Sequence, residues 1–257
     1  MAKQNKRLIT STSPDTWQDL QNEVARILEQ CGFNVEIEKI VETVRGEVEI
    51  DVYAEEIIRG RKYSIICECK NWKTAVPQQI IHAFRTVVGD IGSNIGYIIS
   101  SGGFQSGSFR ASELTNLKLL NWQEFQDEFE QSWYESYFSP TIADELGPLL
   151  TYAEPLLPRW FHDLPEEEKE NYMSLKRKYE EFGWAIMTFT PYSRMLRKDG
   201  IPELPLVEKL PDDSKILENV PQEILEQEAY QEFLDDAIVF GQEVIEKFRA
   251  IRDRNAA

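Results

Sequence analysis

Apolar and polar residues follow regular periods through the first half of the chain. Residues 16–31 place apolar side chains three or four positions apart and are followed by Gly32, so an amphipathic helix is predicted there. Residues 33–41 and 47–55 alternate between apolar and polar, and residues 62–70 form a mostly apolar run, which predicts three strands. The turns between these strands are short, so the three strands should form an antiparallel meander.

The pattern then changes to one of helices and single strands. Residues 77–92 have helical periodicity, residues 95–100 read as a short buried strand, and a further helix is expected from near Ser108. Residues 117–122 would form the last strand. A meander followed by a crossover helix and further strands predicts an α/β fold, with a mixed central sheet flanked by helices.

Beyond about residue 125 the pattern is that of helices and prolines. We predict two domains, an α/β domain over residues 1–128 and a mostly α-helical C-terminal module over residues 129–257. The aromatic residues of this second half are expected to form a helical core, with a ligand pocket or partner surface as the alternative. The expected features are an aromatic-rich helix at 122–138, a proline-broken stretch at 147–160, a helix from Pro165, a proline-punctuated linker at 201–221, and a long terminal helix at 221–255 with Gly241 as a candidate interruption.

The net charge of −17 argues against a nucleic acid partner when taken alone, because phosphate binding needs clustered lysine and arginine. The charge is uneven, however. Residues 1–128 hold 14 Lys+Arg against 18 Asp+Glu, a net of −4, whereas residues 129–257 hold 14 against 27, a net of −13. Basic groups also remain in the first half, at residues 59–62, Lys70 and Lys73. The charge therefore weakens a nucleic-acid interpretation without excluding it.

Two further features indicate the compartment. No stretch approaches the ~18 continuous apolar residues of a membrane-spanning helix, and residues 1–15 lack the apolar core of a signal peptide. The three cysteines, Cys31, Cys67 and Cys69, are an odd number in helix-like and strand-like contexts, which favours reduced thiols packed in a core. A cytoplasmic protein without a membrane partner is expected.

The candidate chemistry lies where the third strand ends, in the sequence YSIICECKNWK at residues 63–73. Side chains alternate between the faces of a strand, so Glu68 and Lys70 share one face, and Asp51 ends a polar face of the preceding strand. If the two strands pair, all three converge. Two carboxylates at one place need a proton or a cation between them, and Mg²⁺ suits oxygen ligands with room for water and phosphate. Such a group of residues is suited to phosphodiester hydrolysis.

The ordered segments GEVEIDVYA, IICECKNWKTAV and IGYIISSGGFQSGSFRAS resemble the Mrr-like, type IV restriction endonuclease domain of the PD-(D/E)xK nuclease superfamily. The resemblance covers roughly residues 15–125 and implies a restriction-endonuclease-like core. It implies Asp51 and Glu68 as metal ligands, with the Cys69 carbonyl as a third, and Lys70 as the catalytic lysine. A glutamine that members carry in the following helix is matched loosely by Gln78 or Gln79, of which Gln79 is our choice.

The sequence departs from the family pattern in two places. The position of a usual Phe-Glu pair in the first helix holds Leu20 and Gln21, and Glu23 could substitute only while facing another way. Glu49, two residues before Asp51, is predicted to share its face and could serve as an extra acid.

Two functions remain open. The first is a Mg²⁺-dependent DNA endonuclease in bacterial restriction or anti-phage defence, with DNA as partner and a homo-oligomer or defence-system protein as a further partner. The second is a catalytically inactive nuclease-fold subunit that binds DNA or forms a complex, with Asp51, Glu68 and Lys70 reduced to a solvated ion-pair face. The intact Asp-Glu-Lys set favours the first, and Gln21 with the acidity favours the second. His82 and His162 are isolated and are assigned structural roles.

Overall fold

The structure is a computed structural model and describes residues 7–193 and 200–255. The chain divides into two compact units. Residues 12–136 form one, which we call the sheet unit, and residues 137–257 with the N-terminal segment up to Ser11 form the other, which we call the helical unit. The boundary predicted after residue 128 lies within the helix α4 (Trp122–Trp133).

The sheet unit contains a five-stranded mixed sheet whose spatial order follows the order of the chain. Its first three strands pair antiparallel, through hairpins that turn at Gly46 and Gly60, both with positive φ. The last two strands add in parallel after helical crossovers, which confirms the predicted mixed sheet. The strands are β1 (Asn34–Thr43), β2 (Gly46–Ile58), β3 (Arg61–Lys70), β4 (Ile95–Ser100) and β5 (Leu117–Leu120).

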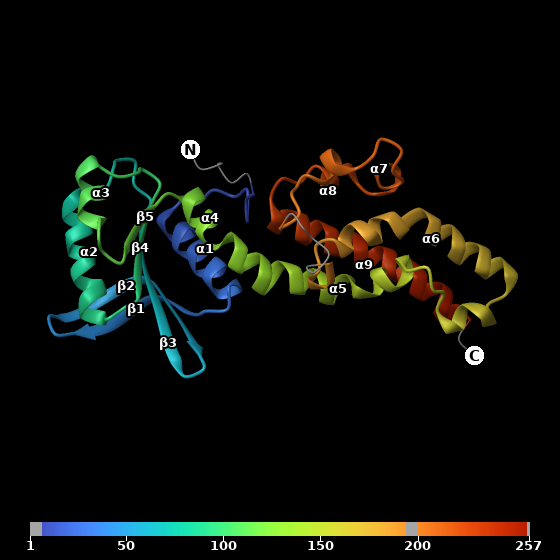
Figure 1. Cartoon of the computed structure of the whole chain (residues 1–257), viewed down its shortest axis with the longest axis horizontal. Helices are drawn as coiled ribbons and strands as arrows, with labels where there is room; N and C mark the ends of the chain where they lie inside the picture. Colours follow the sequence, from blue (N-terminus) through green and yellow to red (C-terminus); the bar gives the residue numbers. More distant parts are fainter. Residues whose placement is uncertain (1–6, 194–199, 256–257) are drawn as a thin grey trace. The chain divides into compact units, whose positions relative to one another are not determined.

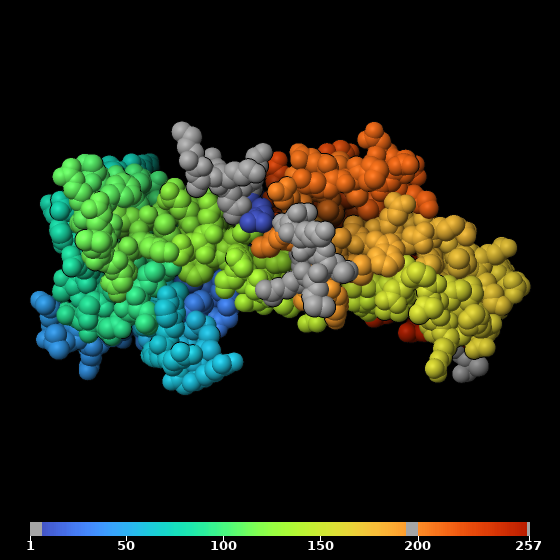
Figure 2. Space-filling view, viewed as in Figure 1, coloured from blue at the N-terminus to red at the C-terminus, as the bar shows by residue number. Residues whose placement is uncertain are grey.

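Helices cover both faces of this sheet (Figure 1). On one face α2 (Gln78–Ile91) and α3 (Ser106–Ser112) pack on a core that includes Ile66 of β3 and Ile98 of β4. On the other face lie α1 (Trp17–Gln30) and α4, where Phe125 and Phe129 pack on the ring of Tyr97 from β4. The strand β3 is therefore the middle strand of a sheet that is buried on both sides. The β2–β3 hairpin ends in a tip that stands out from the surface of its unit (Figure 2).

The alternation predicted for β2 does not continue through Asp51. Ile50 and Tyr53 belong to the same core cluster although they are three positions apart, which a regular pleat does not allow. The residue that stands opposite Asp51 on β1 is Glu38, which has φ of +52°, and the pairs on either side of it are Ile37 with Val52 and Lys39 with Ile50. The backbone distortion at this step interrupts the alternation of β2 side chains between the two faces of the sheet. The prediction that Asp51 shares a regular polar face with Glu49 is therefore wrong.

All three thiols lie in the core of the sheet unit. Burial raises the pKa of Cys31 to about 12 and also raises the pKa values of Cys67 and Cys69. A thiol, unlike a thiolate, is a poor nucleophile. We therefore expect none of the three cysteines to react with an aromatic disulfide reagent in the native protein, and all three to react once denaturant is added. A thiol that reacted rapidly before unfolding would contradict this packing.

The helical unit is built around three long helices, α5 (Ser139–Ala153), α6 (Glu166–Met187) and α9 (Tyr230–Arg254). Aromatic side chains fill its core, among them Phe138, Tyr172, Phe182, Phe233 and Phe248. The shorter elements are η1 (Tyr134–Phe138), which joins α4 to α5, η2 (Arg159–Asp163), η3 (Pro191–Ser193), η4 (Leu206–Lys209), α7 (Ile216–Asn219) and α8 (Gln222–Leu225). In the described ranges, no helix is long and apolar enough to cross a membrane.

Three details of this unit differ from the predictions. The helix α5 continues through Pro148 instead of breaking there. The terminal helix is interrupted before Tyr230, between α8 and α9, and not at Gly241. Gly241 serves packing instead, because a Cβ there would lie 2.5 Å from Leu146 Cδ2. The predicted linker also packs, since Leu206, Ile216 and Val220 are buried.

The N-terminal segment packs on the start of α9. Leu8 and Ile9 accept backbone hydrogen bonds from Tyr230 and Gln231. The Glu232 carboxylate accepts hydrogen bonds from the Thr10 hydroxyl at 2.7 Å and the Ser11 amide at 3.0 Å. Residues 7–11 therefore belong to the helical unit, although in sequence they precede the sheet unit.

Candidate active site

Glu68 and Lys70 lie side by side at the end of the middle strand. Lys70 Nζ is 2.5 Å from Glu68 Oε1, and the two side chains are 16% and 24% exposed, respectively. The alternation of β3 places them on the face that Ile66 also occupies, while Cys67 and Cys69 are buried on the other face. The charged pair therefore lies where the apolar core beneath α2 ends, at an edge that is partly exposed to solvent.

Asp51 reaches the same place from β2. Its Oδ2 accepts a hydrogen bond of 2.7 Å from the backbone N–H of Cys69, the residue between Glu68 and Lys70. The β2–β3 pairing ends with Val52 opposite Cys67, one step before Asp51. The structure thus brings together the three residues that the sequence singled out, and a backbone donor fixes the orientation of the Asp51 carboxylate.

The local electrostatics favour a cation at this place. Burial raises the pKa of Glu68, the Lys70 ammonium opposes that effect, and the nearby Asp51 carboxylate adds to it. A half-buried carboxylate with a second one beside it is stabilised by positive charge, and Lys70 supplies one such charge.

The other predicted site residues are placed less centrally. Gln21 is buried on α1 and its Nε2 lies 3.4 Å from the backbone carbonyl of Asp51, at the edge of hydrogen-bonding distance. Glu23 pairs with Arg26 at 2.6 Å on the same helix, so it is held by a neighbour. Gln79 is exposed in the first turn of α2, and Glu49 is exposed on β2. Gln21, and not Glu23, is the side chain that α1 directs to Asp51.

The loops that follow β3 and β4 support the site and were not predicted from sequence. Ser101 donates hydrogen bonds to the Asn71 side chain at 2.6 Å and to the Trp72 carbonyl at 3.1 Å. Gly102 allows these loops to touch, because a Cβ there would lie 2.5 Å from the Trp72 carbonyl oxygen. The two adjacent glycines at 102 and 103 are the signal in the sequence that could have indicated this contact.

The donor set suits a hard cation that keeps several waters. Two carboxylates, with a backbone carbonyl, are the ligands that Mg²⁺ takes from a protein. Among the described residues, no group of three or more His, Cys, Asp or Glu side chains is placed to hold a metal. The buried thiols of Cys67 and Cys69 face away from the carboxylates, so a thiolate site for zinc is not formed here.

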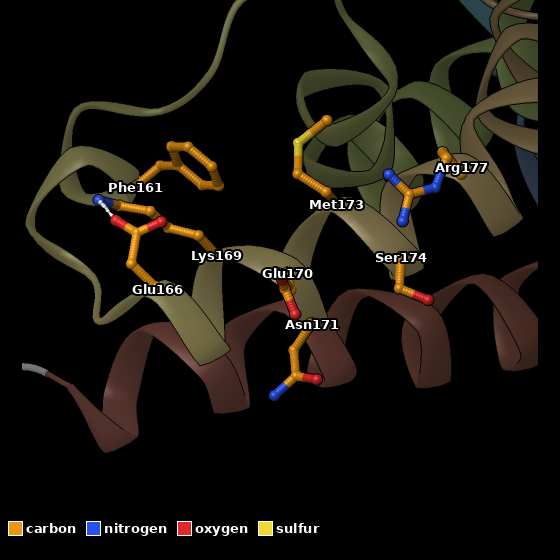
Figure 3. Close-up of a pocket in the computed structure, with 8 residues that line it drawn as sticks. All are labelled: Phe161, Glu166, Lys169, Glu170, Asn171, Met173, Ser174 and Arg177. Carbon is orange, nitrogen blue, oxygen red and sulfur yellow. Dashed lines mark hydrogen bonds and ion pairs between the residues drawn. The ribbon is translucent and has the colours of Figure 1, made fainter.

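Two grooves lie elsewhere on the units. One, of about 430 Å³ on the sheet unit, is lined by Arg45, His82, Arg85, Thr86, Gly89 and Asp90. The other, of about 670 Å³ on the helical unit, lies along α6. In it the Glu166–Lys169 ion pair, at 2.9 Å, lies near Phe161, and Arg177 lies at the far end (Figure 3). Both grooves carry charges of both signs, because Asp90 in the first forms an ion pair with Arg45 at 2.8 Å.

The fold and site define the class of protein: a mixed-sheet α/β domain whose middle strand ends in a Glu-Lys pair with an aspartate from the neighbouring strand. Residues 15–129 match the family model Mrr_cat, described as restriction endonuclease. This stretch, a little under half of the chain, therefore carries the Mrr-like restriction endonuclease domain that the sequence motifs predicted.

No curated protein matches the chain. The crystal structure of AF1548, a protein of unknown function, is similar over 52% of this chain and 78% of that chain, with 24% identity and a TM-score of 0.38.

Proposed function

We propose that the protein is a Mg²⁺-dependent DNA endonuclease. The observation that supports this most directly is the convergence of Asp51, Glu68 and Lys70 at the end of the middle strand of a restriction endonuclease domain. Phosphodiester hydrolysis needs positive charge at the phosphate, an activated water and an ordered site, and these residues can supply or hold each of them.

Each residue has a distinct task in this proposal. Asp51 and Glu68 would hold the ion through their carboxylates, together with the Cys69 carbonyl, and Mg²⁺ supplies charge neutralisation and a more acidic water when bound. Lys70 places its ammonium against the attacked phosphate or the attacking water. Gln79 would contact substrate from the start of α2. The Cys69 amide keeps the Asp51 carboxylate oriented toward β3.

The charge distribution is compatible with DNA as the substrate. The acidity lies mainly in residues 129–257, with a net of −13, while residues 1–128 carry a net of −4. In the groove of the sheet unit the exposed Arg85 offers a cationic group for a phosphate, whereas Arg45 is already paired with Asp90. The proposal includes a role in bacterial restriction or anti-phage defence, in the cytoplasm, and the helical unit would serve sensing, oligomerisation or a defence partner.

The test is cleavage of plasmid DNA by the purified full chain. With Mg²⁺ present, supercoiled plasmid is expected to convert to nicked and linear forms, because the two carboxylates need the cation to bind phosphate. Adding EDTA should stop conversion, and excess Mg²⁺ should restore it. Cleavage that persisted at the same rate in EDTA would contradict the metal-dependent mechanism.

Gln21 favours the second candidate function, a nuclease-fold subunit without catalytic activity. An amide stands next to Asp51 where members of the family usually carry an acid. The same plasmid assay separates the two candidates when paired with a gel-shift measurement. DNA binding without cleavage at any Mg²⁺ concentration would favour the inactive subunit.

A further inference from the structure

An exposed aromatic side chain stands next to the catalytic centre proposed above. Trp72 follows Lys70 by two residues, is 40% exposed, and its ring centroid lies 5.7 Å from Lys70 Nζ. Isolated exposed apolar residues are common on protein surfaces and need no function of their own. The position of Trp72 beside the Glu68–Lys70 pair, and the way its backbone is held, distinguish it from such residues.

The loop after β4 holds the backbone of Trp72 in place. Its carbonyl accepts a hydrogen bond from the Ser101 hydroxyl, and Gly102 packs so closely that no side chain would fit there. Asn71, just before it, donates to the Asp15 carbonyl at 2.8 Å and accepts from Ser101 at 2.6 Å. Further along the loop, the backbone N–H of Val76 donates a hydrogen bond to the Gly103 carbonyl, and the Val76 carbonyl accepts one from the Gln105 N–H. The indole is therefore presented to solvent from a backbone that two other segments of the sheet unit, Asp15 and the loop after β4, hold in place.

A fixed, exposed indole beside cationic side chains is suited to a nucleobase. Any base can stack on an aromatic ring, and the neighbouring cations bind the backbone phosphates of the same strand. Lys70 supplies one cation. Lys73, which directly follows Trp72, is exposed and makes no ion pair with any described residue. A base stacked on Trp72 would lie next to the phosphate that Lys70 contacts.

We propose that Trp72 is a nucleobase-stacking residue of the site, and that its ligand is DNA with an unpaired base beside the attacked phosphate. A base in an intact duplex is already stacked on both faces, so it must leave the stack to reach the indole. Single-stranded or distorted DNA offers such a base at lower cost. This inference rests on the proposed nuclease function, and it adds that the site selects the structure of DNA.

The test compares Trp72→Ala, Trp72→Phe and Trp184→Ala in the full chain. Trp184 is a matched control because it is 41% exposed and lies on α6 in the helical unit. Binding is measured by fluorescence anisotropy in EDTA, with a labelled single strand and with the same strand in a duplex. Trp72→Ala should weaken single-strand binding by roughly 5- to 150-fold, the range for loss of one base stack, while duplex binding changes less.

The control variants and a modified strand identify stacking as the cause. Trp72→Phe should retain most of the single-strand affinity, and Trp184→Ala should retain all of it. An abasic nucleotide, moved along the strand one position at a time, should weaken wild-type binding at one position and have no effect there with Trp72→Ala. Such coupling is not expected if Trp72 only positions Lys70 or supports the loop.

Three results would overturn the inference: unchanged single-strand binding by Trp72→Ala, an equal loss on single strand and duplex, or abasic effects that are the same in wild type and variant. The plasmid assay keeps this outcome separate from the nuclease proposal. If Trp72→Ala cleaves plasmid and binds single strands as wild type does, the stacking proposal fails and the nuclease proposal stands. If strand binding depends on Trp72 but neither protein cleaves plasmid, the nuclease proposal fails and the stacking proposal stands.

Discussion

Lys70→Ala is expected to abolish plasmid cleavage by the full chain, with a rate loss of at least ~10²-fold, the usual cost of removing one preorganised group that stabilises transition-state charge. The ammonium is held 2.5 Å from Glu68, beside the place that Asp51 reaches from β2. A methyl group there leaves neither a donor for the phosphate nor a charge to balance the two carboxylates.

The fold should survive this substitution. Lys70 is the last residue of β3, lies where the apolar core beneath α2 has ended, and is not a member of that core. Glu68 loses its partner, but burial already raises the pKa of its carboxyl, so the uncompensated charge is relieved by protonation more readily than for an ordinary glutamate. Circular dichroism and thermal unfolding of the variant should therefore resemble those of wild type.

The control is Lys62→Ala. Lys62 is the second residue of the same strand, pairs with Glu55 at 2.5 Å and is 55% exposed, so its loss removes a similar ion pair near the opposite end of β3. Its cleavage rate should equal that of wild type. A well-folded Lys70→Ala protein that cleaved plasmid as fast as Lys62→Ala would exclude Lys70 from the chemistry.

The strands and hairpins of the sheet unit could be predicted because the residue patterns that indicate them lie within short stretches of sequence. A run such as residues 63–70 reads as a buried strand whatever lies beside it, and the alternation of Glu68 with Cys67 and Cys69 fixes which face carries the charge. Gly46 and Gly60 indicate the hairpins in the same local way. The placement of Glu68 beside Lys70 could be stated from these positions alone.

Features that depend on distant residues were missed or misread. The change of facing at Asp51 involves Glu38 on the neighbouring strand, and the support of Trp72 involves Ser101 and Gly102 from the loop after β4. The N-terminal segment pairs with residues near Ala229, more than two hundred positions away. Periodicity in a short window contains no information about such pairings.

Pro148 and Gly241 in the helical unit also show that local sequence signals do not reveal contacts with distant residues. A proline inside a helix loses one hydrogen bond and is usually a break, yet α5 continues through Pro148 because the helix is buried against α6 and α9. Gly241 was interpreted as a local break in the terminal helix, whereas its role is to admit the Leu146 side chain from α5. In both cases tertiary packing outweighed the local preference.

Ile66→Ala is expected to lower the free energy of unfolding by about 2–5 kcal/mol, the usual cost of truncating a fully buried aliphatic side chain. Ile66 is 0% exposed, pairs with Tyr53 on β2 and with Gly96 on β4, and packs beneath α2 in the middle strand of the sheet. The truncation therefore leaves a cavity in the middle of this core.

The matched control is Ile57→Ala, the same truncation on β2 at a side chain that is 69% exposed, where a change within about 0.5 kcal/mol is expected. Because the chain has two units, the measurement should report on the sheet unit itself, by hydrogen exchange of the β3 amides at increasing urea. Ile66→Ala should lower the protection of these amides strongly and Ile57→Ala should not. Equal protection in the two variants would mean that β3 is not the central buried strand on which Glu68 and Lys70 are mounted.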